Sequence, residues 1–169
     1  ASDVYKRQEL SGLFEDAGLA IVVEHCDAAG GVGPGEKEFL SLDDEITAVV
    51  GTRVHLTINW GRSVVESHDP ELPARQVARL ADAGVLGGVM LSGAGPDATQ
   101  YGPAWGDAHL PLRNDKPTSL LTTDLVGSFL DAARGLQAYQ GIKIQTPADA
   151  TVERRLAMIT SIHDVMATA

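Results

Sequence analysis

Cysteine, aromatic residues and long apolar runs are all scarce in this chain of 169 residues. The one cysteine, Cys26, has no second cysteine to bond with, so a disulfide-stapled secreted scaffold is excluded. No apolar run approaches the roughly 18–20 residues that a membrane-spanning helix needs. The first residues also lack the basic segment and apolar core of a signal peptide. We therefore expect a cytoplasmic location and no membrane partner.

Basic residues are few as well. The chain has 13 Lys and Arg against 23 Asp and Glu, which gives a formal net charge of −10. A general nucleic-acid binder needs a basic face that neutralises phosphates, so we expect no nucleic-acid partner. With 44% apolar and 21% charged residues, the composition is that of a globular domain, and the length allows a single domain over residues 1–169.

Short apolar runs alternate with amphipathic segments along the chain. Continuous apolar runs predict strands at residues 19–23, 54–59, 88–92 and 141–145, because such runs are typical of strands buried on both faces. Three-and-four spacing, N-terminal caps and terminal glycines predict helices at 4–17, 41–50, 69–83, 123–134 and 151–166. This alternation predicts an α/β fold with parallel strands and right-handed crossovers.

Four βα units can be arranged in two ways. They can form half of a (β/α)8 TIM barrel, or lie flat as a small flavodoxin-like doubly wound sheet. The chain begins with Ala1 and has half the strands of a barrel, so we expect a fragment of a longer chain. Open strand edges in such a fragment could drive formation of a homo-oligomer. Both arrangements place function at the carboxyl ends of the strands.

Polar and aromatic side chains gather at these strand ends and in the long loop that follows the third strand. They are Glu24, His25, Asn59, Trp60, Arg62, Ser92, Tyr101, Trp105, Asp107, His109, Lys143 and Gln145. This concentration predicts a polar ligand pocket, although strand ends are also simply more exposed.

Two features suggest the chemistry of that pocket. Glu24 ends an apolar strand, where an unpaired carboxylate is costly to desolvate. It is therefore a candidate metal ligand or general base, or the structural partner of Arg62 or Lys143. Asp107 and His109 are two residues apart, which in an extended chain puts both on one side. With Glu24 they are candidate ligands of a divalent metal, although a loop aspartate often only forms a turn.

The aromatic residues Trp60, Tyr101 and Trp105 fall at the same edge. A flat ring suits the C–H face of a sugar, but the rings can equally anchor the loops. His68 precedes a helix and is expected to be solvated. Cys26 is expected to be a small buried residue, because no base partner or helix N-terminus is evident beside it.

This pattern resembles the C-terminal half of the xylose isomerase-like TIM barrels, a superfamily of sugar isomerases, epimerases and endonuclease IV type enzymes. The resemblance lies in Glu24 at a strand end and in Asp107, His109 and the Leu-Pro-Leu segment at 110–112. The segments 24–28, 58–63 and 141–145 are similar to an uncharacterised bacterial family of that superfamily, which is a domain of unknown function.

The resemblance implies a sugar isomerase or epimerase that moves a proton next to the carbonyl of a sugar or sugar acid. It also implies a divalent metal, such as Mn, Mg or Zn, held by two glutamates, an aspartate and a histidine. Glu24, Asp107 and His109 match part of that set. The chain departs from it where Asn59, Arg62, Ser92 and Lys143 or Gln145 stand at positions of usual ligands.

Two hypotheses follow from this departure. In the first, the site is catalytic, with Glu24, Asp107, His109 and Lys143 as catalytic residues and a metal either assisting or absent. In the second, the chain is a non-catalytic sugar-binding module on the same scaffold. In both, the residues expected to contact the sugar or sugar acid are His25, Asn59, Trp60, Arg62, Ser92, Tyr101, Trp105 and Gln145.

Overall fold

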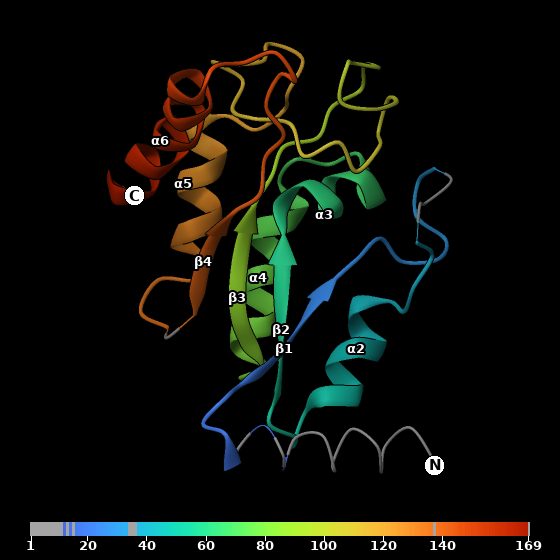
Figure 1. Ribbon diagram of the computed structural model, residues 1–169. Coiled ribbons are helices and arrows are strands. Elements are labelled where there is room, and N and C mark those ends of the chain that lie inside the picture. The colour runs from blue at the N-terminus through green and yellow to red at the C-terminus, as the bar shows by residue number, and fades with distance from the viewer. Residues whose placement is uncertain (1–11, 13, 15, 34–36, 137, 169) are drawn as a thin grey trace.

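The computed structural model describes residues 12, 14, 16–33, 37–136 and 138–168. Four strands form one sheet: β1 (Ile21–His25), β2 (Val54–Asn59), β3 (Leu86–Leu91) and β4 (Tyr139–Ile142). All pairs are parallel and the strand order is β1-β2-β3-β4 (Figure 1). The predicted α/β class with four parallel strands is therefore confirmed.

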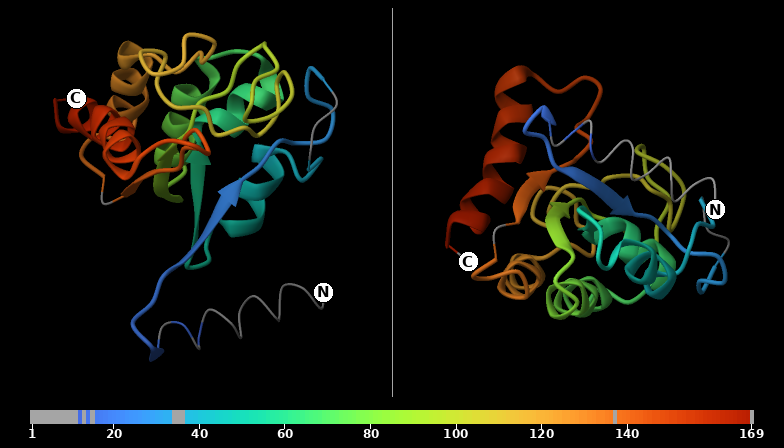
Figure 2. Two further views of the ribbon diagram at one scale, coloured as in Figure 1. Left: turned by 45° about the horizontal axis from the view of Figure 1, so that its top comes forward. Right: turned by 90° about the horizontal axis from the view of Figure 1, so that it is seen from below.

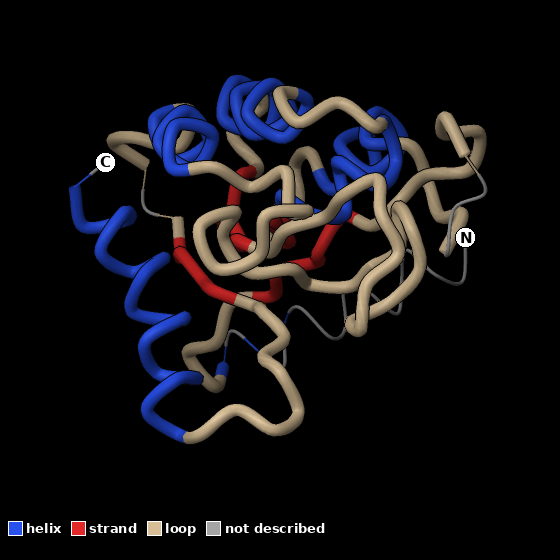
Figure 3. Tube along the Cα trace, turned by 90° about the horizontal axis from the view of Figure 1, so that it is seen from above, coloured by secondary structure: helices blue, strands red, loops and turns tan. Residues whose placement is uncertain are grey.

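The helices form an arc around one side of the sheet (Figures 2 and 3). They are α2 (Leu42–Val49), α3 (Trp60–Ser67), α4 (Leu72–Asp82), α5 (Thr123–Asp131) and α6 (Val152–Thr168). A doubly wound sheet reverses its strand order and carries helices on both faces, whereas successive barrel units keep one order and one helical face. For the part of the chain that the structure describes, the arrangement is consistent with half of a barrel or with a small doubly wound α/β sheet.

The predicted segments agree with these elements to within a few residues, with one exception. No helix is predicted at 60–67, where the structure has α3. The side chain of Asn59 caps this helix by accepting a hydrogen bond from the N–H of Gly61 at 3.1 Å. Gly61, Val64 and Val65 are poor helix formers, so burial against the sheet stabilises α3 more than local propensity does.

The predicted helix at 4–17 lies largely outside the described residues. Within the described part of the chain, β1 and β4 each pair with a single strand, so the predicted homo-oligomer through open edges stays a prediction. No helix among the described residues is long and apolar enough to cross a membrane.

Strand register divides the sheet into two faces. The Cα pairs Glu24–Thr57 and Asn59–Met90 place these residues on one face, because side chains alternate along a strand. His25 pairs with Ile58 and points to the opposite, helix-covered face, where Ile58 is fully buried. The hydrophobic core lies on that face, and the carboxylate of Glu24 lies away from it.

We predict that Gly61→Ala lowers the free energy of unfolding by roughly 1–3 kcal/mol. A Cβ at Gly61 would lie 2.6 Å from Oγ of Ser92 and 2.8 Å from its carbonyl oxygen, so α3 or the end of β3 would have to move. Urea unfolding measures the effect. The matched control is Gly127→Ala in α5, where a Cβ meets nothing within 4 Å. The control should stabilise the helix by about 0.5–1 kcal/mol, and equal stability of both variants would contradict the close approach.

Candidate functional site

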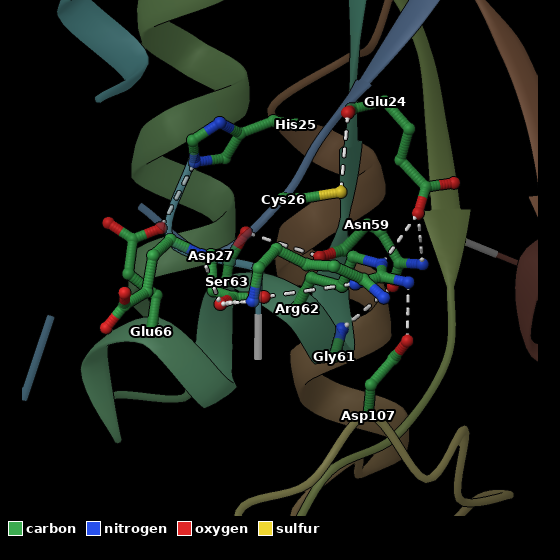
Figure 4. Close-up of polar contacts among 12 residues, drawn as sticks. Glu24, His25, Cys26, Asp27, Asn59, Gly61, Arg62, Ser63, Glu66 and Asp107 are labelled. Carbon is green, nitrogen blue, oxygen red and sulfur yellow. Dashed lines mark hydrogen bonds and ion pairs between the residues drawn. The ribbon is translucent and has the colours of Figure 1, made fainter. Parts of the chain in front are cut away.

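The guanidinium of Arg62, in the first turn of α3, occupies the centre of the site (Figure 4). Its side chain is only 8% exposed, and three carboxylates surround it. Nε donates to Oε1 of Glu24 at 3.0 Å, Nη2 pairs with Oδ2 of Asp107, and Nη1 lies 3.9 Å from Oδ1 of Asp27. We call these four residues the Arg62 cluster. It joins the end of β1, the start of α3 and the loop after β3.

Glu24 has further partners that fix its carboxylate. Nδ2 of Asn59 donates to Oε1 of Glu24 at 3.2 Å, and Nζ of Lys143 lies 3.8 Å from the same oxygen. The Oδ1 atom of Asn59 accepts from the hydroxyl of Ser92 at 2.6 Å, as well as from the N–H of Gly61. The ends of all four strands are therefore linked through one polar network. These contacts match the alternative stated from the sequence, in which Glu24 is the structural partner of Arg62 or Lys143.

Asp107 and His109 lie together, as their spacing predicts. Nδ1 of His109 is 3.1 Å from Oδ1 of Asp107, and the imidazole is 17% exposed. Burial lowers the pKa of His109 below its ordinary value of 6.5, and the charges of Lys143 and Arg62 lower it further, against the opposing effect of Asp107 and Glu24. The imidazole is therefore neutral at neutral pH. Lys143 is the most exposed charged group beside it, at 39%.

His25 lies apart from this site, and its contacts give no support to the predicted contact with substrate. It lies on the other face of β1, turned away from Glu24 (Figure 4), and is 1% exposed. Nδ1 is 2.8 Å from Oε2 of Glu45 in α2, and Nε2 is 3.1 Å from Oε2 of Glu66 in α3. Burial lowers the pKa of His25, but the two carboxylates outweigh it and raise the pKa to about 9. The charged ring holds α2 and α3 against β1.

The predicted aromatic platform is only partly present. Trp60 is fully buried in the hydrophobic core, because it begins α3 on its core-facing side, so its ring cannot meet a sugar. One face of the Trp105 ring is covered by His68, with ring centroids 3.7 Å apart and planes 12° apart. His68 is therefore not simply solvated. Tyr101 remains half-buried in the loop.

Four further residues predicted to bind substrate make other contacts. Asn59 and Ser92 are fully buried: Asn59 donates to the carboxylate of Glu24, and the hydroxyl of Ser92 donates to Asn59. Arg62 is likewise engaged by carboxylates. Gln145 is exposed, and its backbone N–H donates to the carbonyl of His109 at 2.8 Å, which ties the chain after β4 to the loop.

The predicted divalent metal does not fit these side chains as they lie. Oxygens of both Glu24 and Asp107 are directed at Arg62, whose positive charge stands between the two carboxylates. The described residues contain no group of three His, Cys, Asp or Glu side chains placed to hold a metal ion. A cation would have to displace the guanidinium before Glu24, Asp107 and His109 could share it.

Sequence reasoning missed Glu45 and Glu66, and it gave Asp27 and His68 no role in the site. Asp27 is 1% exposed and accepts from the backbone N–H of Lys37 at 2.8 Å in addition to facing Arg62. Its position two residues after His25 is the only sequence signal for it. Glu45 and Glu66 lie 20 and 41 residues from His25, so no local pattern connects them. Cys26 is half-buried and burial raises the pKa of its thiol, which agrees with an inert residue.

The raised pKa of His25 predicts a pH-dependent stability. Because the pKa is about 9 in the folded chain and 6.5 as the ordinary value, the stabilisation is complete below pH 6.5 and is lost as pH rises through 9. The free energy of unfolding should therefore fall over that range by on the order of 3 kcal/mol more in the wild type than in His25→Gln. Denaturant unfolding at several pH values measures this, with His163→Ala as the control. Parallel pH profiles for wild type and His25→Gln would show that the ring is not held as an imidazolium.

Comparisons with known proteins place the chain in a family. An uncharacterised protein of Salmonella typhimurium is 33% identical over 161 residues, which are 94% of this chain and 51% of that protein. The chain thus spans about half the length of this curated relative. No solved structure matches this chain. The resemblance to xylose isomerase-like barrels is not tested by these comparisons and stays a prediction. The model of the family described as Domain of unknown function (DUF4862) matches residues 7–158, and the chain belongs to this family.

Proposed function

We propose that this site transfers a proton at the carbon next to the carbonyl of a sugar acid, as an isomerase or epimerase does, without a metal ion. The observation that carries the proposal is the partly exposed, neutral imidazole of His109 beside Asp107 at the carboxyl edge of the sheet. A general base must be unprotonated at the working pH and within reach of its substrate.

His109 acts as the base in this proposal. Its Nδ1 lies 3.1 Å from Oδ1 of Asp107 without a hydrogen bond between them, so Nε2 is the nitrogen left to take the substrate proton. The negative charge of Asp107 stabilises the imidazolium that forms. The electron pair of the broken C–H bond moves onto the carbonyl oxygen and gives an enolate. Return of the proton to the other face of the same carbon completes an epimerisation. In an isomerisation, the hydroxyl proton on the carbon that lost its C–H proton passes to the former carbonyl oxygen, and the first proton returns to the former carbonyl carbon, so that the carbonyl moves by one carbon.

Lys143 gives the proposal its preference for an anionic substrate. Its ammonium is the accessible cation of the site, and it can pair with a carboxylate of the substrate or with the developing enolate. The carboxylate of Glu24, 27% exposed, can accept hydrogen bonds from substrate hydroxyls or serve as a second proton carrier. Glu24 and His109 come from different elements, β1 and the loop after β3. Proton exchange on two sides of one carbon needs such a pair.

A non-catalytic sugar-binding module is the alternative. One observation favours it: Oε1 of Glu24 is engaged by Asn59, Arg62 and Lys143 at once, so this oxygen is already occupied by partners within the chain. Such a module would bind the sugar acid but leave its C–H bonds intact.

Hydrogen exchange in D2O separates the two functions. We expect the protein to exchange the proton next to the carbonyl of at least one member of a panel of uronic acids, ketoses and aldoses, measured by proton NMR. The rate should be unchanged by EDTA and should fall by about 10²–10⁴-fold in His109→Gln. His163→Ala, on the exposed surface of α6, is the control. Binding of panel members without exchange would favour the module, and exchange abolished by EDTA would reject the metal-free site.

The pH dependence of that rate identifies the base. Because the pKa of His109 lies below 6.5, exchange should persist below pH 6.5 and decline only at lower pH, as the imidazole becomes protonated. In Asp107→Asn the acid limb should move to still lower pH, since Asp107 is a group that raises this pKa. A limb that stays in place in this variant would show that His109 is not the titrating base.

A further inference from the structure

The loop between β3 and α5 carries both Asp107 and His109, so whatever holds this loop also places the proposed base. Its root is tied to the end of β3, where Gly93 and Leu110 exchange two backbone hydrogen bonds of 2.7 and 2.8 Å. The N–H of Leu120 also donates to the carbonyl of Ala94 at 2.9 Å. These bonds fix where the loop leaves and rejoins the fold. The backbone of the segment from Trp105 to His109 is held at its two ends, because the N–H of Trp105 donates to the carbonyl of Gly95 at 2.9 Å and the carbonyl of His109 accepts from the N–H of Gln145 at 2.8 Å. The contacts with α3 hold its side chains.

That segment meets α3 at two places. Near the start of α3, Arg62 pairs with Asp107. At its end, the ring of His68 stacks on the ring of Trp105, with 3.7 Å between centroids and a 12° angle between planes. His68 is the C-cap residue of α3, and Trp105 is two residues before Asp107. The loop is therefore fastened to α3 by an ion pair at one end and by ring stacking at the other.

The backbone at these contacts is unfavourable by itself. Among the described residues, four that are not glycine have positive φ, and three of them are His68 (56°), Trp105 (54°) and His109 (44°). Residues with a Cβ rarely adopt left-handed backbone, and they keep it where surrounding contacts demand it. Without the His68–Trp105 stack, the backbone at Trp105 can relax to a more favourable conformation with negative φ.

We infer that the His68–Trp105 stack is a latch that holds Asp107 and His109 in their working positions, which makes His68 a positioning residue. The kinetic consequence rests on the proposed function, whereas the structural consequence does not. Loss of the stack should misplace His109 without touching Lys143, so turnover should suffer more than substrate binding. A misplacement of about 1 Å at a catalytic group lowers rates by about 10²-fold.

Substitutions of His68 test the latch. His68→Ala should lower kcat of the exchange reaction by about 10²-fold while KM changes little. His68→Phe, which can still stack, should keep most of the wild-type kcat, and His163→Ala should keep all of it. An equal decrease of kcat in His68→Ala and His68→Phe would overturn the inference, and so would a rise of KM with no change in kcat.

A second readout needs no activity. The chain has two tryptophans, and Trp60 is fully buried, so changes in emission report on Trp105. His68→Ala should shift the emission to the red, increase quenching by acrylamide and move the NMR signals of the His109 ring. His68→Phe should leave the emission and quenching near wild type. If the protein exchanges no substrate proton, the proposed function fails, but unchanged emission and unchanged His109 signals in His68→Ala would be needed to reject the latch.

Discussion

A guanidinium that is nearly cut off from water must keep anionic partners, and this requirement of Arg62 organises the carboxyl edge of the sheet. Glu24 from β1, Asp27 from the following loop and Asp107 from the loop after β3 all converge on it. Removing one partner from such a buried set leaves an uncompensated charge, which is far costlier than losing an exposed ion pair. Segments that are distant in the sequence are thereby held in one arrangement, and the position of His109 follows from that of Asp107.

The charges of this cluster also bear on the chemistry. Three carboxylates stand against one guanidinium and the ammonium of Lys143, which leaves a formal excess of one negative charge beside a neutral imidazole. A proton taken up by His109 would cancel that excess. Asp107 and Glu24 favour the imidazolium that forms at the moment of transfer, whereas burial and the charges of Lys143 and Arg62 keep the resting imidazole neutral. The resemblance to xylose isomerase-like barrels, which the comparisons do not test, predicts a divalent metal as the source of positive charge. Here a permanently charged side chain stands between two of the expected ligands.

The sequence allows much of the fold to be predicted but less of the site. Continuous apolar runs and capped amphipathic segments suffice for the parallel sheet, because local pattern and tertiary burial agree there. The same local patterns fail to predict α3, because Gly61 and the two valines of this helix are poor helix formers. The helix is stabilised by the Asn59 cap and by burial. Strand-end position correctly brings Glu24, Asn59, Arg62, Ser92, Asp107, His109 and Lys143 together. It misplaces His25 and Trp60, because a shift of one residue along a strand or into a helix reverses the face that a side chain occupies. The partners Glu45, Glu66 and His68 are set by packing between distant segments, which no local pattern encodes.

The central claim is that Arg62, not a metal ion, supplies the positive charge between Glu24 and Asp107. Titration of the protein with Mn²⁺, followed by paramagnetic broadening of side-chain NMR signals, tests it most directly. We predict that Mn²⁺ broadens the signals of His109 and Glu24 no more than those of exposed acidic residues such as Asp164. We also predict that the broadening of the His109 and Glu24 signals is no smaller in Arg62→Gln than in the wild type. Selective broadening of His109 and Glu24 in the wild type at micromolar Mn²⁺ would contradict the claim.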